Sequence, residues 1–174
     1  SGLAGAAALP AQAAVVQGQS STAAALDALL VDYEAYLRQV DPIGSGMDGD
    51  RAALSRLPDA SRTGELARRA PLNALKAQLD AIDPAALDDA HRLNHAFVGY
   101  LIGREQERIE LDPSRLAFDS EGGPGQLLAY LAPAARIATA ADAEAWLKRL
   151  EAAPAYYDAG IANTRRHNRR ARPP

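Results

Sequence analysis

The sequence predicts an all-α fold, an antiparallel, bundle-like array of five to six helices with one irregular Gly/Pro-rich connection. Apolar residues recur three and four positions apart in several segments, which is the spacing of one helix face. Asp-Pro pairs and glycine clusters separate these segments. Only residues 115–121 (RLAFDSE) alternate weakly and could be extended, and no second alternating segment is present to pair with them.

The first helix is predicted to begin after Ser20–Thr22, because Ser and Thr are favoured N-caps. It ends at Asp41, because a residue that precedes proline is pushed out of the α region. Residues 43–50 contain three glycines and are predicted to form a loop, and residues 51–58 a turn of helix. The apolar face of this first helix comprises Leu26, Leu29, Leu30, Tyr33, Leu37 and Val40.

A second helix is predicted from about Asp59–Ser61 to Ile82, with Pro71 as a kink or as a true first position. A third begins near Ala85 and is closed by Asp112-Pro113, and the short connection predicts antiparallel packing of the two. The second helix carries Leu66, Leu72, Leu75, Leu79 and Ile82 as its apolar stripe. The third is predicted to bury Leu93, Phe97 and Leu101, and it also carries Leu87 and Tyr100.

The C-terminal part is predicted to start with a sharp bend at Gly122–Gly125, followed by a short helix over 126–132 that Pro133 ends. The next helix has Thr139 as its N-cap and Asp142 as the acid of a capping box. A last helix begins at Pro154. Trp146, Leu147 and Leu150 are predicted to form the buried face of the first of these two helices. The last helix carries Tyr156, Tyr157 and Ile161, with Thr164 as a further candidate.

The composition of the sequence divides it into three predicted segments. Residues 1–20 are predicted to be a leader, either a signal-peptide remnant or disordered, because they are Ala-rich and Ala11-Gln12-Ala13 has a cleavage-like spacing. Residues 21–166 form the helical domain, and residues 167–174 a basic, disordered tail. The leader favours a periplasmic or secreted protein, with a cytoplasmic one as the alternative.

Charge and composition exclude several classes of partner and site. Of the 19 Lys and Arg residues, five follow Thr164, which leaves 14 basic against 22 acidic residues in the body. An acidic body argues against a nucleic-acid-binding surface, and the tail RRHNRRAR has no aromatic residue for base stacking. No stretch reaches the length of a membrane span. Without cysteine, disulfides and thiolate metal sites are excluded.

The candidate metal ligands are His91 and His95, which are four residues apart and therefore lie on one helix face. The alternative is that they are surface histidines on the polar side of the third helix. The residues between them are Arg-Leu-Asn, so the general-base glutamate of a zinc-protease motif is missing. We therefore assign no catalytic, cofactor-binding or metal residue, with His91 and His95 as the remaining metal candidates.

Two other patterns favour structural interpretations. The glycines of 122–125 could cradle a phosphate, but no Lys-Ser/Thr pair follows them, so a tight turn is the better interpretation. Glu105, Glu107 and Glu110 lie among arginines at helix-surface spacing, which indicates a solvated charged face rather than an acid–base pair.

Several motifs together resemble the domain of unknown function 885 family of bacteria. They are ALDALLVDYEAYL, RLPDAS, LKAQLDAIDPAALDDAHRLNHAF, FDSEGGPG and TAADAEAWLKRLEAAPAYYDAGIANTRR, and the resemblance covers residues 22–166. Members look like gluzincin-type zinc metallopeptidases with a His-Glu-x-x-His motif far downstream. This chain contains no His-Glu pair, so no catalytic residue carries over.

The resemblance implies a non-catalytic N-terminal helical domain of a zinc metallopeptidase, inactive alone and shortened by truncation, fragmentation or a frame change near Arg166. Zinc is expected as a cofactor of full-length relatives, not of this chain. The expected partner is the missing C-terminal peptidase domain, or a second copy in self-association. The alternatives are a free-standing exported helical binding protein and a metal-binding protein that uses His91 and His95.

Overall fold

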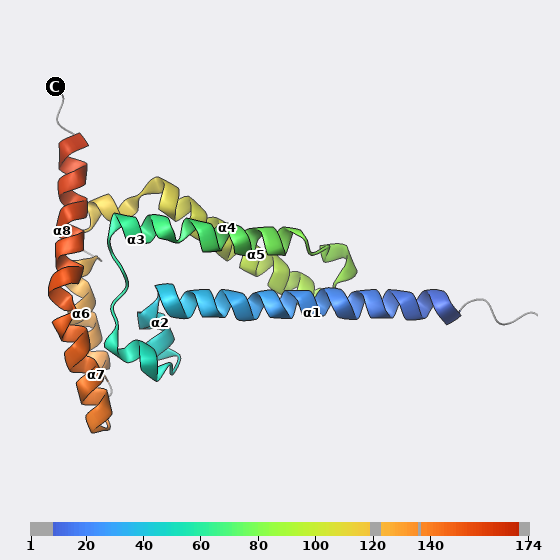
Figure 1. The fold of residues 1–174 in the computed structure, drawn as a ribbon, viewed down its shortest axis with the longest axis horizontal. Helices are drawn as coiled ribbons and strands as arrows, with labels where there is room; N and C mark the ends of the chain where they lie inside the picture. The colour runs from blue at the N-terminus through green and yellow to red at the C-terminus, as the bar shows by residue number, and fades with distance from the viewer. Residues whose placement is uncertain (1–8, 119–122, 136, 171–174) are drawn as a thin grey trace, which may run out of the picture. The chain divides into compact units, whose positions relative to one another are not determined.

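The computed structural model describes residues 9–118, 123–135 and 137–170 (Figure 1). Within these ranges the chain forms helices and turns and contains no strand, so the predicted all-α class is confirmed. Six helices have eleven or more residues: α1 (Leu9–Val40), α4 (Arg69–Asp80), α5 (Asp89–Leu111), α6 (Pro124–Ala134), α7 (Ala140–Glu151) and α8 (Ala153–Arg170). The shorter elements are α2 (Pro42–Met47), α3 (Arg62–Ala67) and the 3-10 turns η1 (Arg51–Ser55), η2 (Pro84–Ala86) and η3 (Pro113–Leu116).

The chain divides into two compact units. The first unit comprises residues 1–34 and 72–105, and the second comprises residues 35–71 and 106–174. Helices α1, α4 and α5 each contribute residues to both units. None of the helices within the described ranges is long and apolar enough to cross a membrane, as the sequence predicts.

The first unit contains an antiparallel pair formed by α4 and α5, as predicted from their short connection (Figure 1). The two helices approach closely at Gly99, where an added Cβ would lie 3.1 Å from Leu79 Cδ2. The buried side chains of this unit are Leu26, Leu29, Leu72, Leu75, Leu79, Ile82, Leu87, Val98 and Ile102. Four residues of the predicted apolar stripe, Leu72, Leu75, Leu79 and Ile82, are therefore confirmed as buried, whereas the fifth, Leu66, is exposed.

The buried face of α5 differs from the predicted one. Leu93 and Phe97 are 70% and 59% exposed, whereas Val98 and Ile102 are buried and Leu101 is half-buried. The helix carries apolar residues on two faces, so helical spacing alone could not select the buried one. Gly99 lies against α4, where an added Cβ would make a tight contact of 3.1 Å with Leu79 Cδ2.

The first helix and the glycine-rich segment after it also differ from the prediction. Helix α1 begins at Leu9, so Ser20–Thr22 lie inside it rather than at its N-cap. Residues 43–50, predicted to be a loop, contain most of α2. Asp41 caps that helix by accepting a 2.9 Å hydrogen bond from the Gly44 N–H, and Pro42 occupies its first position.

The second predicted helix is divided into α3 and α4 at Arg68. Ser61 is the N-cap of α3, within the predicted start at Asp59–Ser61, and its hydroxyl accepts a hydrogen bond from the Gly64 N–H at 3.0 Å. Pro71 lies in the first turn of α4, where a missing N–H costs no intrahelical hydrogen bond. The third helix starts at Asp89, after the separate turn η2.

The C-terminal part is more helical than predicted. The first two residues of the segment 115–121, which could have been extended, belong to the turn η3. Helix α6 runs through Pro133 to Ala134. Helix α8 continues to Arg170, four residues into the predicted tail. The bend precedes α6 at Gly123, whose φ is +74° and whose added Cβ would lie 1.8 Å from the Ala117 carbonyl oxygen. Gly122 of the predicted bend and residues 119–121 of the weakly alternating segment lie outside the described ranges.

A matched pair of substitutions tests which face of α5 is buried. Ile102→Ala should lower the free energy of unfolding by about 2–5 kcal/mol, because it opens a cavity at a fully buried position. Leu93→Ala should change it by less than about 0.5 kcal/mol, since Leu93 is exposed. Urea denaturation of both variants measures the difference. Equal destabilisation by the two substitutions would contradict the observed orientation of α5.

Candidate functional site

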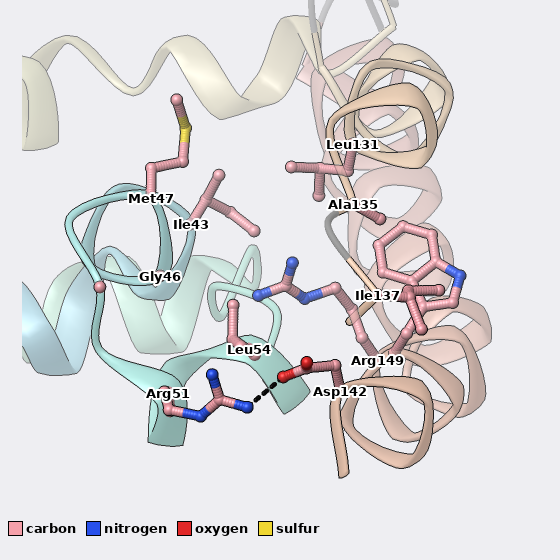
Figure 2. A pocket seen from close by; sticks show the side chains of 12 residues that line it. Ile43, Gly46, Met47, Arg51, Leu54, Leu131, Ala135, Ile137, Asp142 and Arg149 are labelled. Atoms are coloured by element: carbon pink, nitrogen blue, oxygen red, sulfur yellow. Dashed lines mark hydrogen bonds and ion pairs between the residues drawn. The ribbon is translucent and has the colours of Figure 1, made fainter. Parts of the chain in front are cut away.

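The second unit contains an open pocket of about 650 Å³ (Figure 2). It is bounded by α2, η1, α6 and α7, together with the residues that flank α7. Its apolar lining consists of Ile43, Met47, Leu54, Leu131, Ile137 and Trp146. Three charged side chains also line the pocket: Arg51, Asp142 and Arg149. This pocket is our candidate functional site because it combines a small-molecule-sized volume with charged groups.

The start of α7 places Asp142 at the pocket. The predicted capping box is confirmed: the Asp142 N–H donates to the Thr139 hydroxyl, and the Asp142 carboxylate accepts from the Thr139 N–H at 2.9 Å. The hydroxyl of Thr139 also donates to this carboxylate at 2.8 Å. That hydroxyl bond is the main reason why the pKa of Asp142 is lowered. Arg51 pairs with the other carboxylate oxygen and ties η1 to α7.

Arg149 is the unexpected residue of the site, because it is only 5% exposed. Its Nη2 donates to the Ala53 carbonyl oxygen at 2.9 Å, and its Nε donates to the Arg56 carbonyl oxygen at 3.1 Å. Both acceptors are neutral, and burial lowers the pKa of the guanidinium. An arginine nevertheless keeps its proton in a protein. A buried positive charge therefore stands beside the pocket.

Sequence reasoning missed Arg149 because it assigned the buried face of α7 to Trp146, Leu147 and Leu150. Leu147 and Leu150 are exposed instead, and Trp146 is half-buried against the pocket. A usable signal was present, since Asp142, Trp146 and Arg149 follow i, i+4, i+7 spacing on one helix face. A charged residue on an otherwise packed face is easily assigned to solvent when only hydrophobicity is considered.

A second group of charged side chains lies elsewhere in the second unit, around the buried residues Glu65 and Asp112. Arg166 forms a two-pronged pair with Asp112, with one of the bonds at 3.0 Å between Nη2 and Oδ1. Arg62 donates to Glu65 at 2.7 Å and to the Ile109 carbonyl oxygen at 2.9 Å. The Ser114 hydroxyl lies 2.9 Å from both carboxylates, so its single proton serves one of them at a time.

Asp112 is held in a left-handed conformation, with φ at +53° and ψ at +53°. Aspartate adopts this conformation more readily than most residues, and it places the carboxylate where α8 supplies Arg166. The Arg166 hydrogen bonds lower the pKa of Asp112 to about 2, with contributions from Ser114 and Arg62. Every carboxylate oxygen in this charged group is bonded to a neighbouring side chain, which identifies the group as a structural connection between η3, α3 and α8.

The predicted metal candidates lie in the first unit, and each has another partner. His91 Nδ1 lies 2.8 Å from Asp88 Oδ1, and its Nε2 lies 3.8 Å from Asp27 Oδ1. His95 Nε2 lies 3.2 Å from the Leu79 carbonyl oxygen, on the packed side of α5 rather than on an exposed polar face. Over the described ranges, no group of three or more His, Cys, Asp or Glu side chains could hold a metal ion.

The other patterns singled out in the sequence have structural partners as well. Glu110 pairs with Arg69 at 2.7 Å, with both side chains substantially exposed. The Arg104 guanidinium lies 5.8 Å from the centre of the Tyr100 ring, in a cation–π contact on the same helix. The charged surface of α5 is thus consistent with the solvated face that its spacing predicts.

A comparison with known families gives one match. The model of a family described as bacterial protein of unknown function (DUF885) matches residues 42–174, which is well over half of the chain. No curated protein and no solved structure matches the sequence. The family expected from the resemblance is confirmed, and the match reaches beyond Arg166 into the basic tail.

Substitution of Asp112 by Asn should separate charge from backbone geometry, because Asn also tolerates the left-handed conformation. The folded pKa of about 2 lies below the ordinary value of 3.8, so the charged pair contributes its stability above pH 4 and loses it as pH falls towards 2. Near neutral pH, Asp112→Asn should lower the free energy of unfolding by about 2 kcal/mol. Urea denaturation at pH 7, 4 and 2.5 measures the change.

The matched control is Asp158→Asn on the exposed surface of α8, which should shift stability by less than about 0.5 kcal/mol at each pH. The deficit of Asp112→Asn should shrink between pH 4 and pH 2.5, because the Asp112 carboxylate of the unfolded wild-type chain takes up its proton there, whereas the folded one has a pKa of about 2. A deficit that stays constant over this range would show that the Asp112–Arg166 charge pair is not its source.

Proposed function

The chain belongs to the DUF885 family, and on that premise we propose that its helices form a non-catalytic framework of a zinc-metallopeptidase-like protein. In this proposal the zinc-binding and catalytic groups come from residues outside these 174. The motifs FDSEGGPG and 139–166 support it through their resemblance to metallopeptidase-like members. Export to the periplasm or beyond is part of the same proposal.

The observation that carries the proposal is the bonding of the buried acids. A general acid or base has to reach the substrate with a free oxygen or proton. Glu65, Asp112 and Asp142 instead use their carboxylates to hold arginine, serine and threonine side chains of neighbouring elements. Such bonds fix the relative position of helices, which is what a framework must do for a catalytic body.

The exposed side of α5 supports the second half of the proposal, that the framework packs against another body. Leu93, Phe97 and Tyr100 are all more than half exposed and follow at i, i+4 and i+7. A continuous apolar stripe of this kind on a helix is typical of an interaction surface. The stripe would meet the peptidase body in the full protein, or a second copy of the chain when that body is absent.

The activity prediction is that the purified chain, supplied with zinc, hydrolyses casein and short peptide substrates no faster than buffer. The reason is that its sequence contains no His-Glu pair to supply the metal ligand and general base of a zinc peptidase. Hydrolysis is measured by release of fluorescent fragments, with a chelator as the control. Zinc-dependent, chelator-sensitive hydrolysis by this chain would contradict the framework proposal.

The association prediction concerns the stripe on α5. The chain should self-associate with rising concentration, and Phe97→Glu should shift it to monomer, since burial of a charged side chain opposes contact. Analytical ultracentrifugation measures both. Asn94→Glu is the matched control, because it adds the same charge to an exposed position of α5 outside the stripe. A compact monomer of the unmodified chain at high concentration would contradict the prediction.

A second candidate function is that of a helical binding protein, which could also be exported. The specific observation in its favour is the open pocket beside Arg149, because a framework alone does not require such a pocket.

A further inference from the structure

Several N–H donors of the Arg149 guanidinium have no recorded acceptor in the part of the chain that the structure describes. The guanidinium carries five N–H donors, and the two recorded hydrogen bonds take one from Nε and one from Nη2. Nη1 makes no hydrogen bond or ion pair with any residue in the ranges that the structure describes. A charged group that is 95% removed from solvent without an anion carries a large desolvation cost.

The two recorded bonds also fix the orientation of the guanidinium. The carbonyl oxygens of Ala53 and Arg56 hold Nη2 and Nε, so the plane of the guanidinium cannot rotate freely. Gly46 of α2 lies beside it, where an added Cβ would make an ordinary van der Waals contact of 3.7 Å with Nη2. Figure 2 shows the guanidinium extending from α7 into the middle of the pocket. The donor is thus held in place before any ligand arrives, which reduces the entropy cost of binding.

No carboxylate of the pocket lining is available to neutralise Arg149. Asp142 is the acid among the lining residues, and its Oδ1 is taken by Arg51. Its Oδ2 accepts from Thr139 and from the Ala138 N–H. Two guanidinium groups therefore face one carboxylate in this lining, and the excess positive charge belongs to Arg149.

The rest of the pocket is apolar. Ile43, Leu54, Leu131 and Ile137 surround the guanidinium from both sides in Figure 2. A volume of about 650 Å³ is within the range of small-molecule sites and is too small for a folded partner. A guanidinium corner presents parallel donors that match a planar carboxylate. Phosphate sites gather several donors, and only one such unpaired group is present among the described lining residues.

We propose that this pocket binds a small amphipathic carboxylate, with the anionic group on Nη1 of Arg149 and the hydrocarbon part against the apolar lining. The shared chemistry is one carboxylate attached to an apolar chain, as in a fatty acid or at the C-terminus of a short apolar peptide. The proposal is independent of the framework function, since it concerns ligand binding by this chain alone.

The chain provides its own probe, because Trp146 is its single tryptophan and lines the pocket. Titration with octanoate should produce a saturable change in tryptophan fluorescence. Octanol, which has the same chain without the charge, should bind at least tenfold more weakly. Trileucine and its C-terminal amide form the second arm of the experiment. Tighter binding of the free acid than of the amide, and tighter than octanoate, would identify a peptide C-terminus as the source.

Substitution of the exposed residue Met47 tests the charge of the pocket without disturbing the core. Met47 lies at the pocket and is 78% exposed, so Met47→Glu places a negative charge beside the ligand without burying it. Octanoate should then bind at least tenfold more weakly, whereas Met47→Gln, of the same size and uncharged, should bind within about twofold of the parent chain. Arg149→Gln tests the anchor directly, and thermal melting shows whether that variant remains folded.

Three results would each overturn the proposal. The first is that neither octanoate nor trileucine changes the fluorescence of Trp146 in a saturable way. The second is that octanol binds as tightly as octanoate, which would indicate a purely apolar pocket. The third is that Met47→Glu binds octanoate as tightly as Met47→Gln. None of these results bears on zinc-dependent hydrolysis, so the framework proposal is tested separately.

Discussion

The pairing of Asp112 with Arg166 is the constraint on which the second unit depends. Asp112 follows the last residue of α5 and precedes Pro113, so the chain must change direction there, and it does so through a left-handed residue. A non-glycine residue in that conformation costs about 1–2 kcal/mol. The two-pronged bond to Arg166 offsets this cost, and it draws α8 against η3. The turn and the last helix therefore stabilise each other.

Polar contacts of Arg149 and Arg51 likewise connect α7 to η1. Only 5% of the chain is aromatic, and the buried apolar residues of the second unit include the small side chains Ala53, Ala117 and Ala153. Small side chains give a helix surface few features that select one packing position. Buried ionic and polar contacts are directional, so they can select a single arrangement even where their net contribution to stability is small. In the second unit, arginines from α3, η1, α7 and α8 all supply such contacts.

The sequence was sufficient to predict the structural features that depend on residues close together in the chain. The Thr139–Asp142 capping box was predicted correctly because a cap depends on residues within one turn of each other. The stripe of α4 was also correct, since its apolar residues lie on a single face. The position of α2 was missed because the glycines that indicate a loop are tolerated in a short helix that Asp41 caps.

The errors on α5 and α7 have a different cause, because both depend on residues far away in the chain. The buried face of α5 meets Leu79 at Gly99, and nothing near Phe97 encodes that contact. Likewise, Arg149 is buried because the carbonyls of Ala53 and Arg56, more than 90 residues earlier, accept its protons. Hydrophobicity patterns carry no information about such acceptors, so the candidate site could be recognised only from the fold.

The two groups of buried charge differ in how completely their charged side chains are hydrogen-bonded. Around Asp112 the two carboxylates are matched by arginines and a hydroxyl, so neither acid is available to bind a ligand. At Arg149 the bonds are incomplete, and the unused donor lies beside an open apolar space. A buried guanidinium without an anion carries a desolvation cost, and a bound carboxylate would offset it. That the pocket stays open at this donor is the physical reason to look for a ligand there.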